Sequence, residues 1–375
     1  MKRYLLSLLT GLLLVGDVLA QEDTSVAIEK QPAAEQGKGV LLSPKAFRAA
    51  ARKVQPSLVR IEGFGGVAGS VGSAGFQPPG EGPTTGLIIS SDGYILTSTF
   101  NFLRKPPVIT VVLPDGERKV AKLLGRDETR RICVLKVDGV EGLSTPEYAP
   151  RDELKVGQWA VALGVGFGGD RPALSTGIIS ATQRISAKAV QTDANLSPAN
   201  YGGPLIDLDG RVIGLCVPLS PQSRDEAAGA EWYDSGIGFA VPIAEIAERI
   251  EAMKRGDSFQ PAFLGVQAKA YGTPAQGVKI VEVAADSPAM KVGLQADDIV
   301  ISLDEVEPLD PVHFATLVGR YVAGEKAKLN YRRQDDIQTV EIEFAIPPAK
   351  TEPPKPKQPP MPGDAPAPNP PDGPA

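Results

Sequence analysis

Three Asp-Gly pairs, each between stretches rich in apolar residues, constrain this chain of 375 residues more than any other feature. The pairs and the segments around them are Asp92-Gly93 in 86–100, Asp115-Gly116 in 108–124 and Asp209-Gly210 in 204–218. An Asp-Gly pair between alternating apolar residues is a strong local signal for a β-hairpin, because glycine adopts the positive φ angles that tight turns require. Three such hairpins, spread over about 170 residues, predict an all-β barrel or sandwich domain.

The apolar period changes from that of a strand to that of a helix near Ala240. A helix is predicted from Pro242 to Gly256, with one apolar face that packs on the β domain and consists of Ile243, Ile246, Ile250 and Met253. Residues 257–262 are predicted to be a linker, and residues 263–346 a second domain with short strands and two helices. A serine or aspartate followed by proline marks the start of each of the other three expected helices, at Ser43-Pro44, Ser287-Pro288 and Asp310-Pro311.

Both ends of the chain differ in composition from the middle. Residues 1–20 have a basic start, a short apolar run and small residues before Gln21, which predicts a secretory signal peptide and an exported protein, periplasmic or secreted. The apolar run is too short to span a bilayer, and no later stretch is apolar enough. Residues 21–43 are predicted to be a flexible lead-in, and residues 347–375, with 13 prolines, a disordered extended tail.

Composition excludes several classes of partner and cofactor. The net charge is −6 and basic residues are not clustered, which argues against nucleic acid as a partner. No histidine and cysteine cluster has the spacing of metal ligands, so neither a metal nor another cofactor is predicted. Cys133 and Cys216 could pair in an oxidising compartment or remain as two buried thiols.

A series of short motifs in order resembles the HtrA/DegP proteins, which are exported trypsin-like serine proteases followed by a PDZ domain. The motifs are TGLII at 85–89, DGYILT at 92–97, ICVLKV at 132–137, LKVG at 154–157, QTDA at 191–194, NYGGP at 200–204 and GIGFAVP at 236–242. The resemblance implies a mainly β fold, with a chymotrypsin-like double β-barrel at 44–256 and an α+β PDZ domain at 263–346. It also implies a homo-trimer, although 21–43 contains no aromatic residue to anchor one.

The same alignment places other residues at the three catalytic positions of the family. Phe100 stands where the family has its histidine, Arg131 where it has its aspartate, and Tyr201 where it has its serine. A serine nucleophile needs a base and an orienting carboxylate, and the one histidine of the chain, His313, lies in the second domain. The sequence therefore predicts no catalytic residues and a catalytically inactive protein. The alternative is an active endopeptidase with non-standard groups, such as Ser197 with Lys188.

Two hypotheses concern the surroundings of Tyr201. The first is that Phe100, Arg131 and Tyr201 cluster and fill the cleft, with the arginine against the rings. In the second, Arg131 pairs with an acidic neighbour, for which Asp127, Glu128 and Asp193 are candidates. The loop keeps its two glycines in either case, because glycine permits backbone angles that other residues avoid.

The second domain retains the motifs of peptide recognition. Phe263, Leu264, Gly265 and Val266 resemble the PDZ loop that holds a terminal carboxylate through backbone N–H groups. The helix predicted from Pro311 to Tyr321, with Phe314 and Leu317, is expected to form the other wall, while His313 is left as a solvent-facing residue or a specificity contact. The predicted function is binding of C-terminal or unfolded segments of envelope or secreted proteins, as an adaptor, a quality-control factor or a protease regulator.

Overall fold

The structure is a computed structural model that describes residues 33–64, 84–103, 105–166, 172–220, 235–272 and 277–348, with the backbone alone for 33–43 and 64. The predicted signal peptide and most of the proline-rich tail lie outside these residues. The chain divides into two units, Met1–Lys45 and Ala46–Ala375, and the second contains all the strands. Among the described residues, no helix has the length and apolar character needed to cross a membrane.

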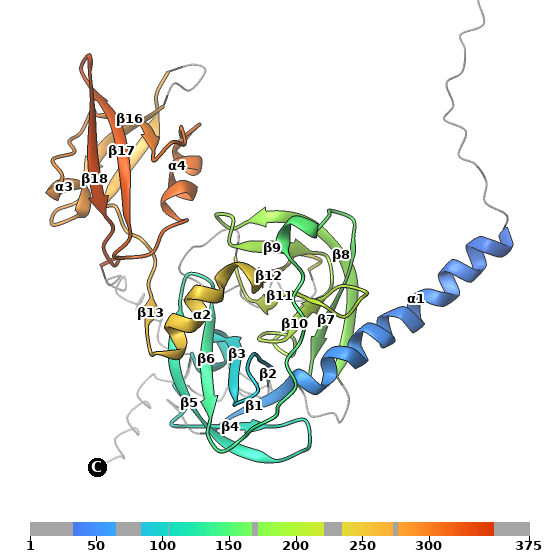
Figure 1. Cartoon of the computed structure of the whole chain (residues 1–375). Coiled ribbons are helices and arrows are strands. Elements are labelled where there is room, and N and C mark those ends of the chain that lie inside the picture. Colours follow the sequence, from blue (N-terminus) through green and yellow to red (C-terminus); the bar gives the residue numbers. More distant parts are fainter. Residues whose placement is uncertain are drawn as a thin grey trace, which may run out of the picture. The chain divides into compact units, whose positions relative to one another are not determined.

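The first barrel contains six strands and two of the predicted hairpins (Figure 1). They are β1 (Leu58–Phe64), β2 (Thr84–Ile88), β3 (Tyr94–Ser98), β4 (Val108–Val112), β5 (Arg118–Asp127) and β6 (Ile132–Val137). Their order is β5-β4-β1-β2-β3-β6, and pairing of β5 with β6 closes the barrel. The β2–β3 and β4–β5 hairpins confirm the predicted turns, in which Gly93 and Gly116 have φ angles of +96° and +90°.

The second barrel also contains six strands and closes on itself in the order β10-β11-β12-β9-β8-β7. The strands are β7 (Trp159–Gly164), β8 (Ala173–Arg184), β9 (Ala189–Thr192), β10 (Pro204–Ile206), β11 (Val212–Val217) and β12 (Gly238–Pro242). The third predicted hairpin is β10–β11. Every residue of β10, β11 and β12 is buried, because these strands lie between the interiors of the barrels and the covering helix. Two barrels of this kind confirm the predicted chymotrypsin-like fold.

Short helices connect and cover the barrels. In the described part of the chain, the single 3-10 turns are η1 (Gln55–Ser57), η2 (Thr99–Phe102), η3 (Arg151–Glu153) and η5 (Ala244–Ile246). The last leads into α2 (Ala247–Lys254), and the four apolar residues of the predicted stripe are all buried in the barrel core. That part of the prediction is confirmed.

The first helix, α1 (Ala33–Val54), is longer than the sequence indicated. The prediction placed its start at Ser43-Pro44, but the helix begins ten residues earlier and has Pro44 inside it. Seven of the ten extra residues, 33–42, are alanine, leucine, glutamate, glutamine or lysine, which favour helix, and Pro44 gives up one backbone hydrogen bond. Ala50, Ala51 and Val54 at its end are buried in the barrel core.

The segment predicted as a linker contains a short strand. Ser258 and Phe259 form β13 (Ser258–Phe259), which pairs in parallel with the end of β5, and Glu128 N donates to Phe259 O at 3.0 Å. The next residue already belongs to the second domain, because Ala323 N donates to Gln260 O at 3.0 Å. The connection between the two domains is therefore the single peptide between Phe259 and Gln260.

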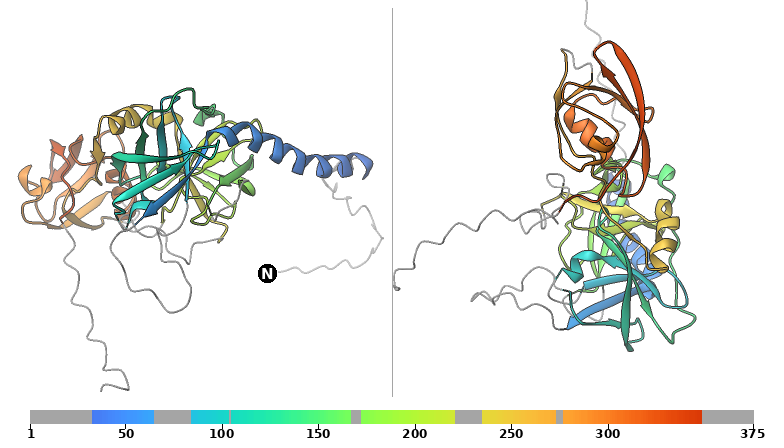
Figure 2. Two further views of the ribbon diagram at one scale, coloured as in Figure 1. Left: turned by 90° about the horizontal axis from the view of Figure 1, so that it is seen from below. Right: turned by 90° about the vertical axis from the view of Figure 1, so that its left-hand side faces the viewer.

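The second domain is a five-stranded antiparallel sheet with two helices. Its elements are β14 (Val266–Ala270), β15 (Val278–Val283), α3 (Pro288–Lys291), β16 (Ile299–Leu303), α4 (Pro311–Val318), β17 (Lys326–Arg333) and β18 (Asp336–Glu343). Helix α4 packs against β14 and β16, in front of the sheet in the right-hand view of Figure 2. Ser287 and Asp310 cap the two helices as predicted, and accept from Met290 N at 3.2 Å and His313 N at 2.7 Å.

Candidate functional site

The loop at 197–204 is a tight turn whose backbone is hydrogen-bonded within itself and to the first barrel. Asn200 N donates to Ser197 O at 2.9 Å, and Tyr201 N to Pro198 O at 3.3 Å. Thr85 Oγ1 donates to Ala199 O at 2.7 Å. An oxyanion hole requires backbone N–H groups as donors. In this conformation the N–H groups of Asn200 and Tyr201 donate to carbonyl oxygens of the turn itself.

Neither of the two glycines of the loop has room for a side chain. A Cβ on Gly202 would lie 2.2 Å from both Thr85 O and Thr97 Oγ1, and one on Gly203 would lie 2.2 Å from Leu163 O. Gly202 also has a φ angle of +85°, which a residue with a side chain rarely adopts. The glycines thus fix the path of the loop whichever residue occupies position 201.

Phe100 and Tyr201 lie together in the apolar interior of the second barrel. Their ring centroids are 5.3 Å apart at an interplanar angle of 72°, an edge-to-face contact. Phe100 is 2% exposed and Tyr201 is 3% exposed. The structure therefore brings two of the three aligned positions into contact, inside a cluster that includes Leu154, Leu196 and Leu205.

Arg131 connects to this pair through its backbone. Its carbonyl oxygen accepts from Thr99 N at 2.9 Å and from Ser98 Oγ at 3.1 Å, just before Phe100. Its Nη1 lies 3.9 Å from Glu128 Oε2, so Glu128 is the one within ion-pair distance of the three acidic neighbours considered. Asp127 instead binds Arg130 at 3.0 Å, and Asp193 accepts from Ile178 N at 2.6 Å.

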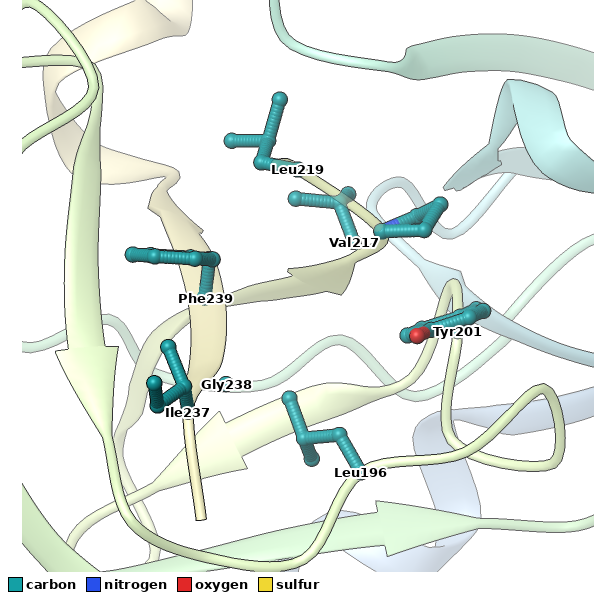
Figure 3. Close-up of a pocket in the computed structure, with 8 residues that line it drawn as sticks. Leu196, Tyr201, Val217, Leu219, Ile237, Gly238 and Phe239 are labelled. Carbon is teal, nitrogen blue, oxygen red and sulfur yellow. The ribbon is translucent and has the colours of Figure 1, made fainter. Parts of the chain in front are cut away.

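A small apolar pocket lies beside Tyr201 (Figure 3). Leu196, Val217, Pro218, Leu219, Ile237, Gly238 and Phe239 complete its lining, and its volume is about 10 Å³, room for about one water molecule. Ser197, the alternative nucleophile, donates through Oγ to Asn200 Oδ1 at 3.4 Å.

The two thiols are unpaired and lie in different barrels, Cys133 in β6 and Cys216 in β11. Burial raises the pKa of the Cys216 thiol to about 12 and raises the pKa of Cys133 as well, so both are protonated at neutral pH.

The second domain has a larger apolar groove, with a volume of about 250 Å³. It lies between the start of β14 and helix α4, and its lining is Ala262, Phe263, Leu264, Gly265, Val266, Ala268, Pro311, Phe314, Ala315 and Val318. Five of the six peptide-binding residues expected from the sequence are in this lining. The sixth, Leu317, is in the domain core.

The loop before β14 displays unused hydrogen-bond donors. Phe263 N donates to Ala345 O at 2.9 Å, whereas the N–H groups of Leu264 and Gly265 have no hydrogen-bond partner among the described residues. Gly265 has a φ angle of +84°, and a Cβ there would lie 2.2 Å from Ser287 Cβ. β14 is also an edge strand, because the described part of the sheet has only β15 beside it.

The sequence reasoning missed Ala262, Ala268, Pro311, Ala315 and Val318 as groove residues. A signal existed for α4, where residues 311, 315 and 318 recur at the spacing of one helix face. His313 lies off that face, and its Nδ1 accepts from Leu309 N at 3.0 Å.

Comparisons with known proteins agree with this division of the chain. Residues 84–215 match the trypsin-like peptidase domain family, and residues 262–344 match the PDZ domain family. A probable periplasmic serine endoprotease DegP-like of Pseudomonas fulva is 32% identical over 293 residues, which are 74% of this chain and 59% of that protein. The protein of the same name from Halomonas elongata is 32% identical over 69% of this chain and 55% of its own length.

Among solved structures, the HtrA-type protease AlgW with tripeptide has a TM-score of 0.63 and 25% identity, over 81% of this chain and 98% of that chain. This chain spans between half and two thirds of the length of the two curated relatives. The names of these relatives confirm the predicted export and favour the periplasm.

The prediction that the chain is not an enzyme is contradicted by these comparisons. The relatives are named serine endoproteases and the structural neighbour is an HtrA-type protease, which points to an enzyme. The prediction relied on Phe100, Arg131 and Tyr201, whereas the similarity to the first relative extends over 293 residues. The replacements at these three positions exclude the standard catalytic triad, but they do not exclude catalysis by other side chains.

Proposed function

We propose that this chain, which is similar to DegP-like serine endoproteases and matches the PDZ domain family, binds extended or C-terminal segments of other exported proteins through its PDZ domain. The observation that carries this proposal is the groove between β14 and α4, about 250 Å³ in volume, beside two unused backbone N–H groups. The pocket beside Tyr201, at about 10 Å³, has no comparable room.

The groove combines the three elements that an extended peptide needs. The outer edge of β14 offers backbone hydrogen bonds to an added strand, which supply much of the affinity in this mode of recognition. The N–H groups of Leu264 and Gly265 are placed to hold a terminal carboxylate, and the apolar lining receives side chains of the ligand.

The test is a binding titration of the chain from Gln21 onward. Fluorescein-labelled decapeptides with an apolar last residue are compared as free carboxylates and as C-terminal amides, by fluorescence anisotropy. The carboxylate form is expected to bind at least about tenfold more tightly, since a charge-assisted hydrogen bond contributes roughly 1.5–3 kcal/mol. Equal affinities, or no binding of either form, would contradict the proposal.

A matched pair of variants locates the binding in the groove. Gly265→Ala places a Cβ 2.2 Å from Ser287 Cβ and is expected to abolish carboxylate-dependent binding. Gly324→Ala is the control, because Gly324 also has a positive φ angle, +88°, but has open space around its Cβ position. Near-ultraviolet circular dichroism of both variants reports whether the fold persists.

A second candidate function is endopeptidase activity, which the names of the relatives favour. Within the barrels it would require groups other than Phe100, Arg131 and Tyr201, and Ser197, four residues before Tyr201, is the candidate nucleophile. Incubation with unfolded casein tests it. Cleavage that is lost in Ser197→Ala and kept in Ser175→Ala would assign the nucleophile, and absence of cleavage by the purified chain would reject this function.

A further inference from the structure

We propose that the end of α1 and the start of β7 form a surface that binds a bilayer of anionic lipids. In this proposal Arg48 and Arg52 contact lipid phosphates, and Trp159 lies at the level of the headgroups. None of these residues lines the groove of the second domain or the pocket beside Tyr201, so the inference adds a second binding surface to the chain.

The end of α1 has one face in the barrel and one face in solvent. Ala50, Ala51 and Val54 are buried in the barrel core, whereas Arg48 and Arg52 are exposed. At about 100° per residue, the two arginines lie one turn apart on the same side of the helix. Their mean direction is about 130° from that of the three buried residues, so both guanidinium groups are on the solvent side.

The positive charge of the two arginines is not neutralised locally. Neither makes an ion pair with an acidic side chain in the described part of the chain, and the sequence has no acidic residue between Glu35 and Glu62. The arginines are separated in the sequence, and the helix brings them to one side. In a chain of net charge −6 they therefore create a local positive surface.

An exposed aromatic residue lies beside this helix. Trp159 begins β7 and is 47% exposed, and its ring meets that of Phe47 of α1 edge to face, with centroids 5.4 Å apart. Val156, three residues before Trp159, is 65% exposed. The exposed Lys155 offsets the charge of the exposed Asp152. The surface beside α1 is thus apolar without a net negative charge.

Unpaired arginines next to an exposed tryptophan match the chemistry of a lipid surface. A guanidinium group forms paired hydrogen bonds with phosphate oxygens, and an indole ring suits the boundary between headgroups and acyl chains. A dissolved polyanion would engage the arginines but would leave Trp159 and Val156 in water. The relatives are named periplasmic, and that compartment lies between membranes, so such a surface is within reach of an exported chain.

The first test is sedimentation of the chain from Gln21 onward with lipid vesicles. Vesicles of phosphatidylglycerol are compared with vesicles of phosphatidylcholine, which has no net charge. Binding is expected to the anionic vesicles alone. It should weaken at least about tenfold between 0.15 M and 1 M salt, because the screening length falls from about 8 Å to about 3 Å.

A matched pair of double variants locates the binding on α1. Arg48→Gln with Arg52→Gln is expected to weaken binding to the anionic vesicles at least about tenfold, and glutamine preserves the helix. Lys291→Gln with Arg320→Gln is the control, because it removes the same charge from exposed positions of the second domain and should leave binding unchanged. Equal losses in the two double variants would overturn the inference, because net charge alone would then explain the binding.

The fluorescence of Trp159 distinguishes a lipid surface from other anionic partners. The chain has two tryptophans, so Trp232→Phe leaves Trp159 as the single reporter. Its emission is expected to shift to shorter wavelength with phosphatidylglycerol vesicles and to stay unchanged with phosphatidylcholine vesicles. Binding without this shift would overturn the inference.

Size-exclusion chromatography of the Arg48→Gln, Arg52→Gln variant tests whether a second copy of the chain covers the surface instead. An unchanged elution volume is expected. Loss of self-association in this variant, together with no binding of the unmodified chain to anionic vesicles, would assign the surface to a contact between copies and overturn the inference.

Discussion

Gly202 shows how a single residue can fix the loop that carries Tyr201. Its missing side chain lets the loop approach Thr85 O and Thr97 Oγ1, at a φ angle that favours glycine. The loop also ties the barrels together, because Thr85 of the first barrel donates to Ala199 O and accepts from Val165 N.

We expect Gly202→Ala to lower the free energy of unfolding by roughly 3 kcal/mol or more, through overpacking and backbone strain. Gly116→Ala is the matched control. It has a similar φ angle but nothing within 4 Å of the Cβ position, and it should cost only about 1 kcal/mol. Urea denaturation measures the loss of unfolding free energy in each variant. Equal losses would show that the close approach of Thr85 and Thr97 to Gly202 does not add to the cost of a side chain there.

The contact between Phe100 and Tyr201 is testable by a double-mutant cycle. Each single change to alanine is expected to cost about 3–5 kcal/mol, because both rings are almost fully buried. The edge-to-face contact should appear as a coupling of about 1 kcal/mol between them. Phe100 and Phe344, which belong to different apolar cores, form the control pair and should be additive.

Residues at this site were predictable to different degrees. The order of motifs placed Phe100 and Tyr201 at the aligned positions, and the structure brings their rings into contact. The neighbour of Arg131 was not predictable, because three acidic residues were available and only the three-dimensional path of the turn brings Glu128 to 3.9 Å.

At the scale of elements, helix α4 depends on its cap. Asp310 accepts from His313 N at 2.7 Å, and its removal in Asp310→Ala should cost about 1 kcal/mol. Because α4 forms one wall of the groove, we expect weaker peptide binding as well. Asp335→Ala, in the exposed turn between β17 and β18, is the control, and thermal unfolding together with peptide titration measures both effects.

Elements with a local signature were predictable, and those that depend on distant partners were not. Capped helices and Asp-Gly hairpins are specified within about ten residues, and α3, α4 and all three hairpins formed as expected, whereas α2 has no side-chain cap and the predicted start at Pro242 is the end of β12. β13 has two residues and exists only because β5 offers a partner more than a hundred residues away. No local pattern encodes such a strand.

At the scale of the whole molecule, each barrel buries one thiol. Ionisation of a buried thiol is unfavourable, whereas an unfolded thiol ionises near pH 9. The folded pKa is raised, so this contribution to stability is complete below pH 9 and is lost as the pH rises toward 12.

We therefore expect the free energy of unfolding to fall between about pH 9 and about pH 11, with Cys216 contributing up to about 3 kcal/mol of that fall. A double variant with alanine at positions 133 and 216 should be less stable at pH 7, because it contains cavities, but should lose less stability as the pH rises. Parallel curves for the two proteins would show that the thiols do not contribute. Urea denaturation at each pH gives the comparison.

The connection at Phe259 and Gln260 leaves almost no unbound chain between the two domains. Phe259 O accepts from the barrel and Gln260 O accepts from the PDZ domain, so φ and ψ of Gln260 are the soft torsions between these two carbonyl groups. A pulling force on a bound peptide would be transmitted through this connection to β13. From β13 it would reach β5 and the turn that contains Arg131.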